Sequence, residues 1–392
     1  MLPPSSFWTN FDSSDDQVQT ALQSINFSSL SRIASEICGK SCAIDNTKCA
    51  YGGVNIVFEV KFNDDEIWIA RIRRPDADDP LNGKDLVLES EVVTIRFIHE
   101  NTTIPVPVVH GYDARFGPDN AVGRPYILMQ AMPGQRVYEG CRTDIIPDQY
   151  KTRVYEQVSD YIAQLHGLPF REIGMLLLDD KAPLNVRVGP IHDQHHRLQP
   201  YGPFNNSFDF YLSRWDSLRK HREAKGENKK VDLVVSDEDM PTALRLLIDR
   251  RAENGPFYLA HPDFQLSNFL FDQNFTITAL LDWSGCQTVP LESSARHPIH
   301  IVPDADKFLD TIFGHLMTRE LRSQMARRRE LFLKVFQKRV NDTRLTQMML
   351  SSRSFFAARL DFDGILGFQR WLPKTEFDVF VKEEVVNSLD SQ

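Results

Sequence analysis

The sequence predicts an α+β protein of two lobes, the first built on an antiparallel sheet and the second mainly helical. The chain has 392 residues, more than a single hydrophobic core usually supports. Apolar and polar side chains alternate over residues 54–72, as they do in half-buried strands. After Pro133 and Gly134 the apolar residues recur at helical spacing. We therefore expect one lobe over residues 1–133 and the other over residues 134–392.

The elements of the first lobe follow from local patterns. An apolar stripe predicts helix over residues 17–40, with a serine-rich break. A β-hairpin should follow, opened by Gly52 and Gly53, and after it a helix and two short extended segments. The expected hairpin strands are 54–62 and 67–72, the helix is 86–99, and the extended segments are 104–109 and 125–129.

The second lobe should begin with a helix, because residues 154–165 form one apolar stripe. Residues 170–235 contain proline, glycine and histidine clusters, and we expect an irregular insertion there. A further helix is expected over residues 241–252, with Ser236 and Asp237 as candidate capping residues. A second hairpin should follow, with its strands over 269–271 and 277–281.

The composition excludes several classes of partner. The chain has 54 acidic and 45 basic residues, a formal charge of -9, so we expect neither a nucleic acid nor a membrane as partner. A cationic substrate would be better tolerated than a polyanion. The five cysteines lack the paired spacing of zinc sites and are interpreted as buried free thiols. No signal sequence and no long apolar run are recognised, so the cytoplasm is the expected location.

Three polar residues interrupt the apolar segments around the second hairpin. Asp263 lies in the loop that leads into the hairpin, Asn268 precedes its first strand and Asp282 follows its second. A hairpin should return Asp282 close to Asn268. Phosphoryl transfer requires an oriented hydroxyl and a metal held on oxygen ligands, and these residue types supply both. An isolated aspartate in a loop is usually a turn residue, but the combination argues against chance.

The order and spacing of these residues resemble the aminoglycoside phosphotransferase and choline kinase family of the protein-kinase-like superfamily. The segment His261-Pro262-Asp263-x4-Asn268 is similar to the family's H-G-D-x4-N motif, and Leu281-Asp282-Trp283 is similar to its I-D-W motif. The resemblance extends from about Gly52 to Trp283. It implies a two-lobed protein-kinase-like fold with the nucleotide between the lobes. It also implies that Asp263 is the catalytic base and that Asn268 and Asp282 bind magnesium.

The activity implied is an ATP- and magnesium-dependent transfer of phosphate to the hydroxyl of a small molecule, with GTP as the alternative nucleotide. The substrate is expected to be a small hydroxylated compound, for which a positive charge is compatible with the acidic chain. Choline, amino alcohols, aminoglycosides and sugars all stay open. The sequence departs from the motif at Pro262, at Arg71 in place of lysine, and at Ser284 in place of an acidic residue. These departures motivate the alternative of an inactive pseudokinase or nucleotide-binding regulatory module. A protein kinase is disfavoured because no D-F-G or A-P-E motif follows Asp282.

The first lobe supplies a separate test of this interpretation. The kinase-like template requires a cation on the third strand and a carboxylate on the next helix. Arg71 is the expected cation, and Glu91 is expected to pair with it because it falls inside the apolar stripe of its helix. Arg73 lies on the same strand face and competes for this role. In the alternative interpretation both arginines lie at an exposed edge and Glu91 reaches solvent.

Other residues are assigned through the same resemblance. Gly52 and Gly53 are expected to let backbone amides approach a phosphate, with Asn55 as a further contact. Residues 129–132 should border the adenine. We expect His261 to support its loop by hydrogen bonds, and we interpret the pair at residues 195–196, with Asp193, as surface residues rather than a metal cluster.

Overall fold

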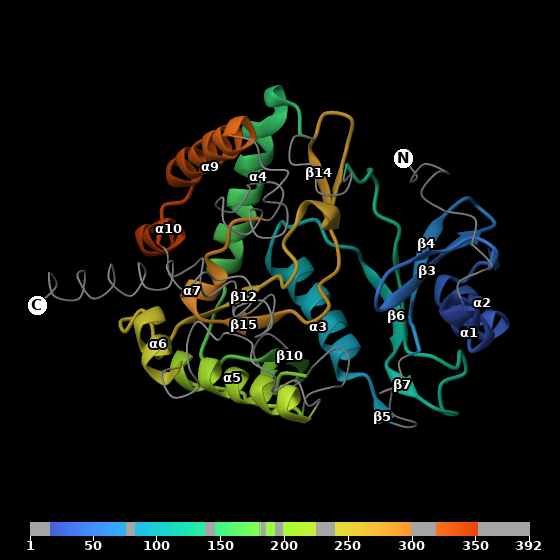
Figure 1. The fold of residues 1–392 in the computed structure, drawn as a ribbon. Helices are drawn as coiled ribbons and strands as arrows, with labels where there is room; N and C mark the ends of the chain where they lie inside the picture. Colours follow the sequence, from blue (N-terminus) through green and yellow to red (C-terminus); the bar gives the residue numbers. More distant parts are fainter. Residues whose placement is uncertain are drawn as a thin grey trace, which may run out of the picture.

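A computed structural model describes residues 16–75, 83–137, 146–179, 181, 186–192, 199–224, 240–298 and 319–351. Figure 1 shows an N-terminal sheet with its own helices on one side of the molecule and a mainly helical part on the other. The helix α3 (Leu86–Asn101) lies between them. The predicted α+β architecture, with an antiparallel sheet followed by helices, is present.

The N-terminal sheet is antiparallel, with strand order β1-β3-β4-β8-β6 and with β2 paired to β3. Alternate side chains of β3 and β4 pack against the helices α1 (Asp16–Gln23) and α2 (Phe27–Cys38), because successive residues of a strand point to opposite faces. The strands are β1 (Cys42–Ile44), β2 (Ala50–Tyr51), β3 (Asn55–Phe62), β4 (Ile67–Arg73), β6 (Val109–Asp113) and β8 (Tyr126–Gln130). The opposite face of β3 and β4 faces the second part of the molecule.

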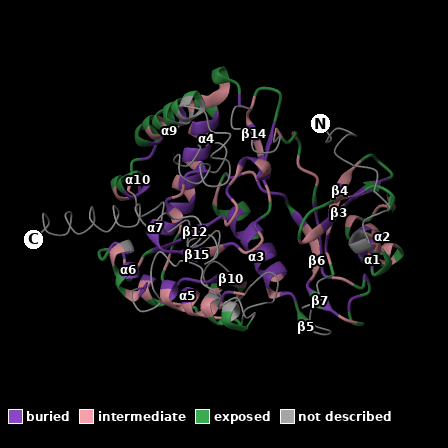
Figure 2. Ribbon diagram, in the orientation of Figure 1, coloured by how far each residue is buried: buried purple, intermediate pink, exposed green. Residues whose placement is uncertain are grey.

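The helix α3 begins at a well-formed cap, in which the Asp85 side chain accepts a hydrogen bond from the Leu88 backbone nitrogen (3.0 Å). It is buried along most of its length, as Figure 2 shows. Its apolar residues share one hydrophobic core with strand β8 and with the helix α4 (Asp148–His166). The sheet and the helical part are therefore packed on a common core.

The helical part is organised around α4. The helix α9 (Arg319–Arg339) packs along it, and the Arg339 guanidinium donates to both carboxylate oxygens of Asp160 (2.6 and 2.7 Å). The other α-helices of the described residues in this part are α5 (Ser207–Ala224), α6 (Met240–Leu247), α7 (Leu291–Ser294) and α10 (Thr343–Leu350). Short strands complete this part: β9 (Pro169–Phe170), β10 (Met175–Leu178), β11 (Val186–Gly189), β12 (Phe257–Ala260), β13 (Phe269–Phe271), β14 (Ile277–Leu280) and β15 (Gln287–Val289). A further pair, β5 (Gly83–Lys84) and β7 (Arg115–Phe116), adjoins the N-terminal sheet.

The order hairpin, helix and two strands is confirmed in the first part, and so is the β13–β14 hairpin. The prediction that residues 170–235 are irregular is wrong for the described part of this segment. That part contains a β10–β11 hairpin and the 18-residue helix α5. Asn206 caps the N-terminus of α5, because its side-chain oxygen accepts a hydrogen bond from the Asp209 backbone nitrogen (2.8 Å). This cap was not predicted from the sequence. Aromatic side chains of α5 then pack on α6, which fixes the helix by tertiary contact.

Two smaller expectations also need correction. Residues 104–108 form no strand, and β6 begins only at Val109, because prolines interrupt the segment. The helix expected over 241–252 ends at Leu247, after which the Asp249 carboxylate accepts from the Arg251 backbone nitrogen (3.0 Å) in a turn. The candidate caps Ser236 and Asp237 lie outside the described residues, as do Asp193, His195 and His196.

Among the described cysteines, Cys38, Cys42, Cys49 and Cys286 are free thiols. Cys49 and Cys286 are buried as expected, whereas Cys38 and Cys42 are only partly buried. In the described part of the chain, no helix combines the length and the apolar character that a membrane crossing requires.

Candidate active site

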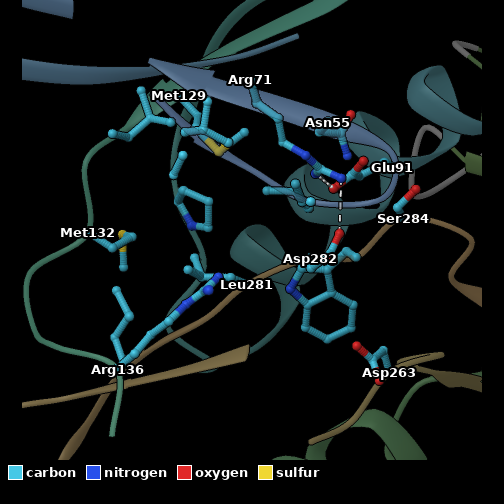
Figure 3. Close-up of a pocket in the computed structure, with 18 of the residues that line it drawn as sticks. Asn55, Arg71, Glu91, Met129, Met132, Arg136, Asp263, Leu281, Asp282 and Ser284 are labelled. Atoms are coloured by element: carbon cyan, nitrogen blue, oxygen red, sulfur yellow. Dashed lines mark hydrogen bonds and ion pairs between the residues drawn. The ribbon is translucent and has the colours of Figure 1, made fainter. Parts of the chain in front are cut away.

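A cleft of about 860 Å³ lies between the sheet and the helical part. Its lining comes from the free face of β3 and β4 with the glycine segment before them, from residues 129–136, and from the loops 262–265 and 281–284. Figure 3 shows Arg71, Asn55 and Glu91 grouped at one end of this cleft, with Asp282 directed toward them. Of the residues to which the sequence assigned catalysis or the binding of nucleotide or metal, all except Asn268 line this cleft.

Arg71 is held by three side chains from different elements. Its Nη2 donates to Asp282 Oδ1 (2.9 Å), and Nη1 donates to Glu91 Oε1. With the Asn55 amide oriented so that its oxygen faces Arg71, this oxygen accepts hydrogen bonds from Arg71 Nε (2.9 Å) and Nη2 (2.6 Å). The expected ion pair between strand and helix is therefore present. Arg73 instead lies beside Asp85, with Nε and Oδ2 3.5 Å apart.

This ion pair is largely shielded from solvent, since the side chains of Arg71 and Glu91 are 12% and 3% exposed. Burial raises the pKa of Glu91 to about 7, and the charge of Arg71 opposes that rise. Burial also disfavours charge on Arg71, but the carboxylates of Glu91 and Asp282 outweigh it and raise the arginine's pKa. Arg71 therefore stays cationic, while Glu91 is close to protonation at neutral pH.

The loop that carries Asp263 is fixed by amide side chains. Asn268 Nδ2 donates to Asp263 Oδ2 (2.9 Å) and to its backbone oxygen (2.8 Å), and Gln265 Nε2 donates to the same Oδ2 (2.7 Å). The other carboxylate oxygen, Oδ1, is buried and has no hydrogen-bond partner within the described part of the chain. One oxygen of Asp263 is thus anchored, while the second can accept a proton or a hydrogen bond from a ligand.

His261 supports the same loop in a single tautomer. Its Nδ1 accepts from the Asp263 backbone nitrogen (3.1 Å), so Nε2 carries the hydrogen and donates to the Leu281 backbone oxygen (2.9 Å). Burial lowers the pKa of this imidazole and keeps it neutral. The bonds link the Asp263 loop to the segment before Asp282, as expected for a supporting residue.

The β13–β14 hairpin brings the last two candidates together. The Leu281 backbone nitrogen donates to the Asn268 backbone oxygen (2.9 Å), which places Asp282 beside Asn268 at one end of the hairpin. Asp282 has φ +64, a conformation that aspartate tolerates better than most residues, and its side chain is half-exposed. The buried Trp283 anchors the turn, with Nε1 donating to the Leu280 backbone oxygen (3.0 Å).

The glycine segment covers the same cleft. Gly52 and Gly53 line it, and the Gly52 backbone oxygen accepts from Arg74 Nη1 (2.6 Å). A Cβ added at either glycine would meet no atom within 4 Å, so internal packing does not explain them. The space beside both glycines is open toward the cleft that they line.

The donor set fits magnesium better than a metal that needs a full protein cage. Among the described residues no group of three or more His, Cys, Asp or Glu side chains could hold a metal ion. Magnesium is typically bound by one or two carboxylates together with substrate phosphates and water. The Asp282 carboxylate and the Asn268 amide oxygen, whose nitrogen is used by Asp263, match that pattern.

Two residues of the cleft, Gln265 and Arg136, were not predicted from sequence patterns. Gln265 lies two positions after Asp263, and only the loop geometry shows that its amide reaches that carboxylate. Arg136 follows the Pro133-Gly134 break and lines the cleft. The position of Arg136, a basic residue just after the predicted lobe boundary, was the sequence feature that could have indicated a cleft residue.

No curated protein sequence matches the chain. Similar solved structures include a thermostable mutant of the aminoglycoside phosphotransferase APH(4)-Ia (15% identity, 90% of this chain and 98% of that chain, TM-score 0.46). Others are the macrolide 2'-phosphotransferase MphH of Brachybacterium faecium (14%, 85% and 90%, 0.44) and an ethanolamine kinase of Plasmodium vivax (11%, 88% and 82%, 0.46).

A sequence model described as "Phosphotransferase enzyme family" (APH) matches residues 55–291. This range contains Arg71, Glu91 and the three polar residues of the β13–β14 region. The resemblance to a phosphotransferase family inferred from the motifs is confirmed, and the predicted α+β architecture is present. The chain belongs to the phosphotransferase enzyme family.

Proposed function

We propose that this protein transfers the γ-phosphoryl group of ATP to a hydroxyl of a small molecule in a magnesium-dependent reaction. The observation that carries the proposal is the asymmetry of Asp263. Two amides hold its Oδ2, whereas the buried Oδ1 has no partner in the described chain. A carboxylate fixed in this way can orient a hydroxyl and accept its proton.

In the proposed reaction the substrate hydroxyl donates its proton to Asp263 Oδ1, and its oxygen attacks the γ-phosphorus. The bond between that phosphorus and the β–γ bridging oxygen breaks, and ADP leaves. Asn268 and Asp282 would hold magnesium, whose positive charge would offset that of the phosphates. Arg71 would contribute positive charge near the phosphates while keeping Asp282 in place. GTP is the alternative nucleotide.

The nucleotide would lie between the proposed lobes of residues 1–133 and 134–392, covered by Gly52, Gly53 and Asn55 and bordered by Met129 and Met132. The substrate would be a small hydroxylated compound. The net charge of -9 favours a neutral or cationic compound over an anionic one.

The test is a screen for ATP consumption with small hydroxylated amines and sugars, in which the Asp263→Asn variant is the control. This variant keeps the shape of the side chain but cannot accept the proton. We expect turnover to fall by roughly 10²–10⁴-fold while nucleotide binding is kept. Turnover within a factor of three of wild type would remove Asp263 from the catalytic role.

A regulatory nucleotide-binding module is the second candidate. Its support is the ion pair of Arg71 with Asp282, which occupies a proposed magnesium ligand, and the motif changes at Pro262 and Ser284. This candidate predicts binding of Mg-ATP without turnover on any hydroxylated compound. Substrate-dependent release of ADP that is lost in Asp263→Asn would exclude it.

A further inference from the structure

The segment that crosses from the sheet to the helical part is fastened to the β13–β14 hairpin. The backbones of Gln135 and Phe271 exchange two hydrogen bonds, both of 2.9 Å, and Thr278 Oγ1 donates to the Pro133 backbone oxygen (2.5 Å). Gly134 has φ +113, and a Cβ there would lie 2.2 Å from Thr278 Oγ1, so a side chain would not fit. The same hairpin carries Asn268 and leads to Asp282.

This anchoring determines the position of Arg136. The residue directly follows the bonded Gln135 and lines the cleft. Figure 3 shows its long side chain reaching inward toward Leu281, from the side of the cleft away from Arg71. Arg136 is an exposed residue that lines the cleft, and the negative charge of Asp282 favours the charged form of its guanidinium.

The charges of the cleft make a second cation significant. The described residues that line it include three carboxylates, Glu91, Asp263 and Asp282, and two arginines. Arg71 already donates to two of these carboxylates and to Asn55. A nucleotide triphosphate entering this cleft would bring further negative charge, and repulsion from the carboxylates would have to be offset.

We infer that Arg136 binds the phosphates of the nucleotide, as a second cationic contact on the side of the cleft away from Arg71. The inference rests on the proposed function. The guanidinium presents several donors in a planar fork that matches phosphate oxygens. Because the segment is anchored to the hairpin of Asn268 and Asp282, the backbone that carries Arg136 is held in a fixed relation to the proposed magnesium site.

The experiment measures dissociation constants for Mg-ATP and for adenosine by titration calorimetry, with wild type, Arg136→Met, Arg136→Lys and Arg32→Met. Arg32 is an exposed arginine on α2 that pairs with Glu36 (2.6 Å), so its substitution controls for the loss of one positive charge. Arg136→Met should weaken Mg-ATP binding roughly 10- to 100-fold, the range of a hydrogen bond between charged groups. Adenosine affinity should stay within threefold of wild type.

Arg136→Lys keeps the charge but not the fork, so we expect a smaller loss for Mg-ATP, roughly 3- to 10-fold. Arg32→Met should bind both ligands as wild type does. An Arg136→Met affinity for Mg-ATP within threefold of wild type would overturn the inference, and so would an equal loss for adenosine, which would indicate a nucleoside contact. If Arg136→Met does not fold, Arg136→Lys is compared with wild type instead. A Mg-ATP dissociation constant within threefold of wild type, or an equal loss for adenosine, then overturns the inference. Failure of the wild type to bind Mg-ATP would refute the proposed function itself.

Discussion

The Arg71–Glu91 pair allows the sharpest test of how the cleft is built. Replacing Glu91 by glutamine removes the carboxylate that Arg71 contacts on α3, but leaves the arginine bound to Asp282 (2.9 Å) and Asn55. Replacing Arg71 by methionine leaves Glu91 only 3% exposed and without its countercharge. The pKa of Glu91 is already raised to about 7, so the isolated carboxyl should take up a proton at neutral pH.

Breaking a buried ion pair by removing one partner costs about 3–5 kcal/mol. We expect each single substitution to lie near the lower limit, about 3 kcal/mol in unfolding free energy. Arg71 keeps two other partners, and Glu91 can be neutralised by a proton. The double variant leaves neither charge stranded, so it should be more stable than the sum of the two losses implies. The coupling energy should be about 1–3 kcal/mol.

The assay is urea denaturation of the wild type, both single variants and the double variant at pH 7.5, repeated as a cycle on the dissociation constant of Mg-ATP. The denaturation cycle tests the contact, and the binding cycle tests its proposed role in holding the nucleotide. Losses that add within about 0.3–0.5 kcal/mol would show that the two side chains act independently. That result would refute the reasoning.

Two further predictions concern other parts of the molecule. Mg-ATP at a hundred times its dissociation constant should stabilise the wild type by about 2.7 kcal/mol, measured as a rise in melting temperature. Asp282→Asn, which tolerates the positive φ but lacks the charge, should stay folded and lose most of that rise; an unchanged rise would remove Asp282 from the magnesium site. Burial lowers the pKa of His166, which stacks on Tyr258, to about 4. Above the unfolded-state pKa of about 6.5, His166 is neutral in both the folded and the unfolded protein, so its effect on the free energy of unfolding is fully present. As the pH falls below that value, the unfolded chain binds a proton before the folded protein does, and the stability decreases. Between pH 7.5 and 5 the free energy of unfolding of the wild type, measured by urea denaturation, should fall by about 2 kcal/mol because of His166. The His166→Phe variant should not show this part of the decrease. Equal decreases in both proteins would contradict the lowered pKa of His166.

Local patterns were sufficient for much of the fold. The alternation over residues 54–72 predicted the β3–β4 hairpin, and helical spacing predicted α3 and α4, because these periodicities depend on neighbouring residues alone. The helix α5 was missed since its apolar side chains do not form one clear stripe and its packing against α6 decides the conformation. The apolar residues of 104–108 resemble a strand, but the prolines between them prevent one from forming.

The candidate site shows the same division. The spacing of Asp263, Asn268 and Asp282 around a predicted hairpin was enough to bring them to one end of it, because a hairpin closes over a few residues. The position of Glu91 in an apolar stripe likewise predicted that it needs a buried partner. These inferences used only local geometry and the cost of burying charge.

The amino-acid sequence by itself therefore determined the main elements, the family and the residue types that the cleft brings together. Only the tertiary structure decided which arginine meets Glu91, since Arg71 and Arg73 lie on the same strand face. It also decided that Arg71 reaches Asp282, 211 residues away, and that Arg136 enters the cleft. Such contacts depend on how distant segments pack on a shared core, and no local periodicity encodes that arrangement.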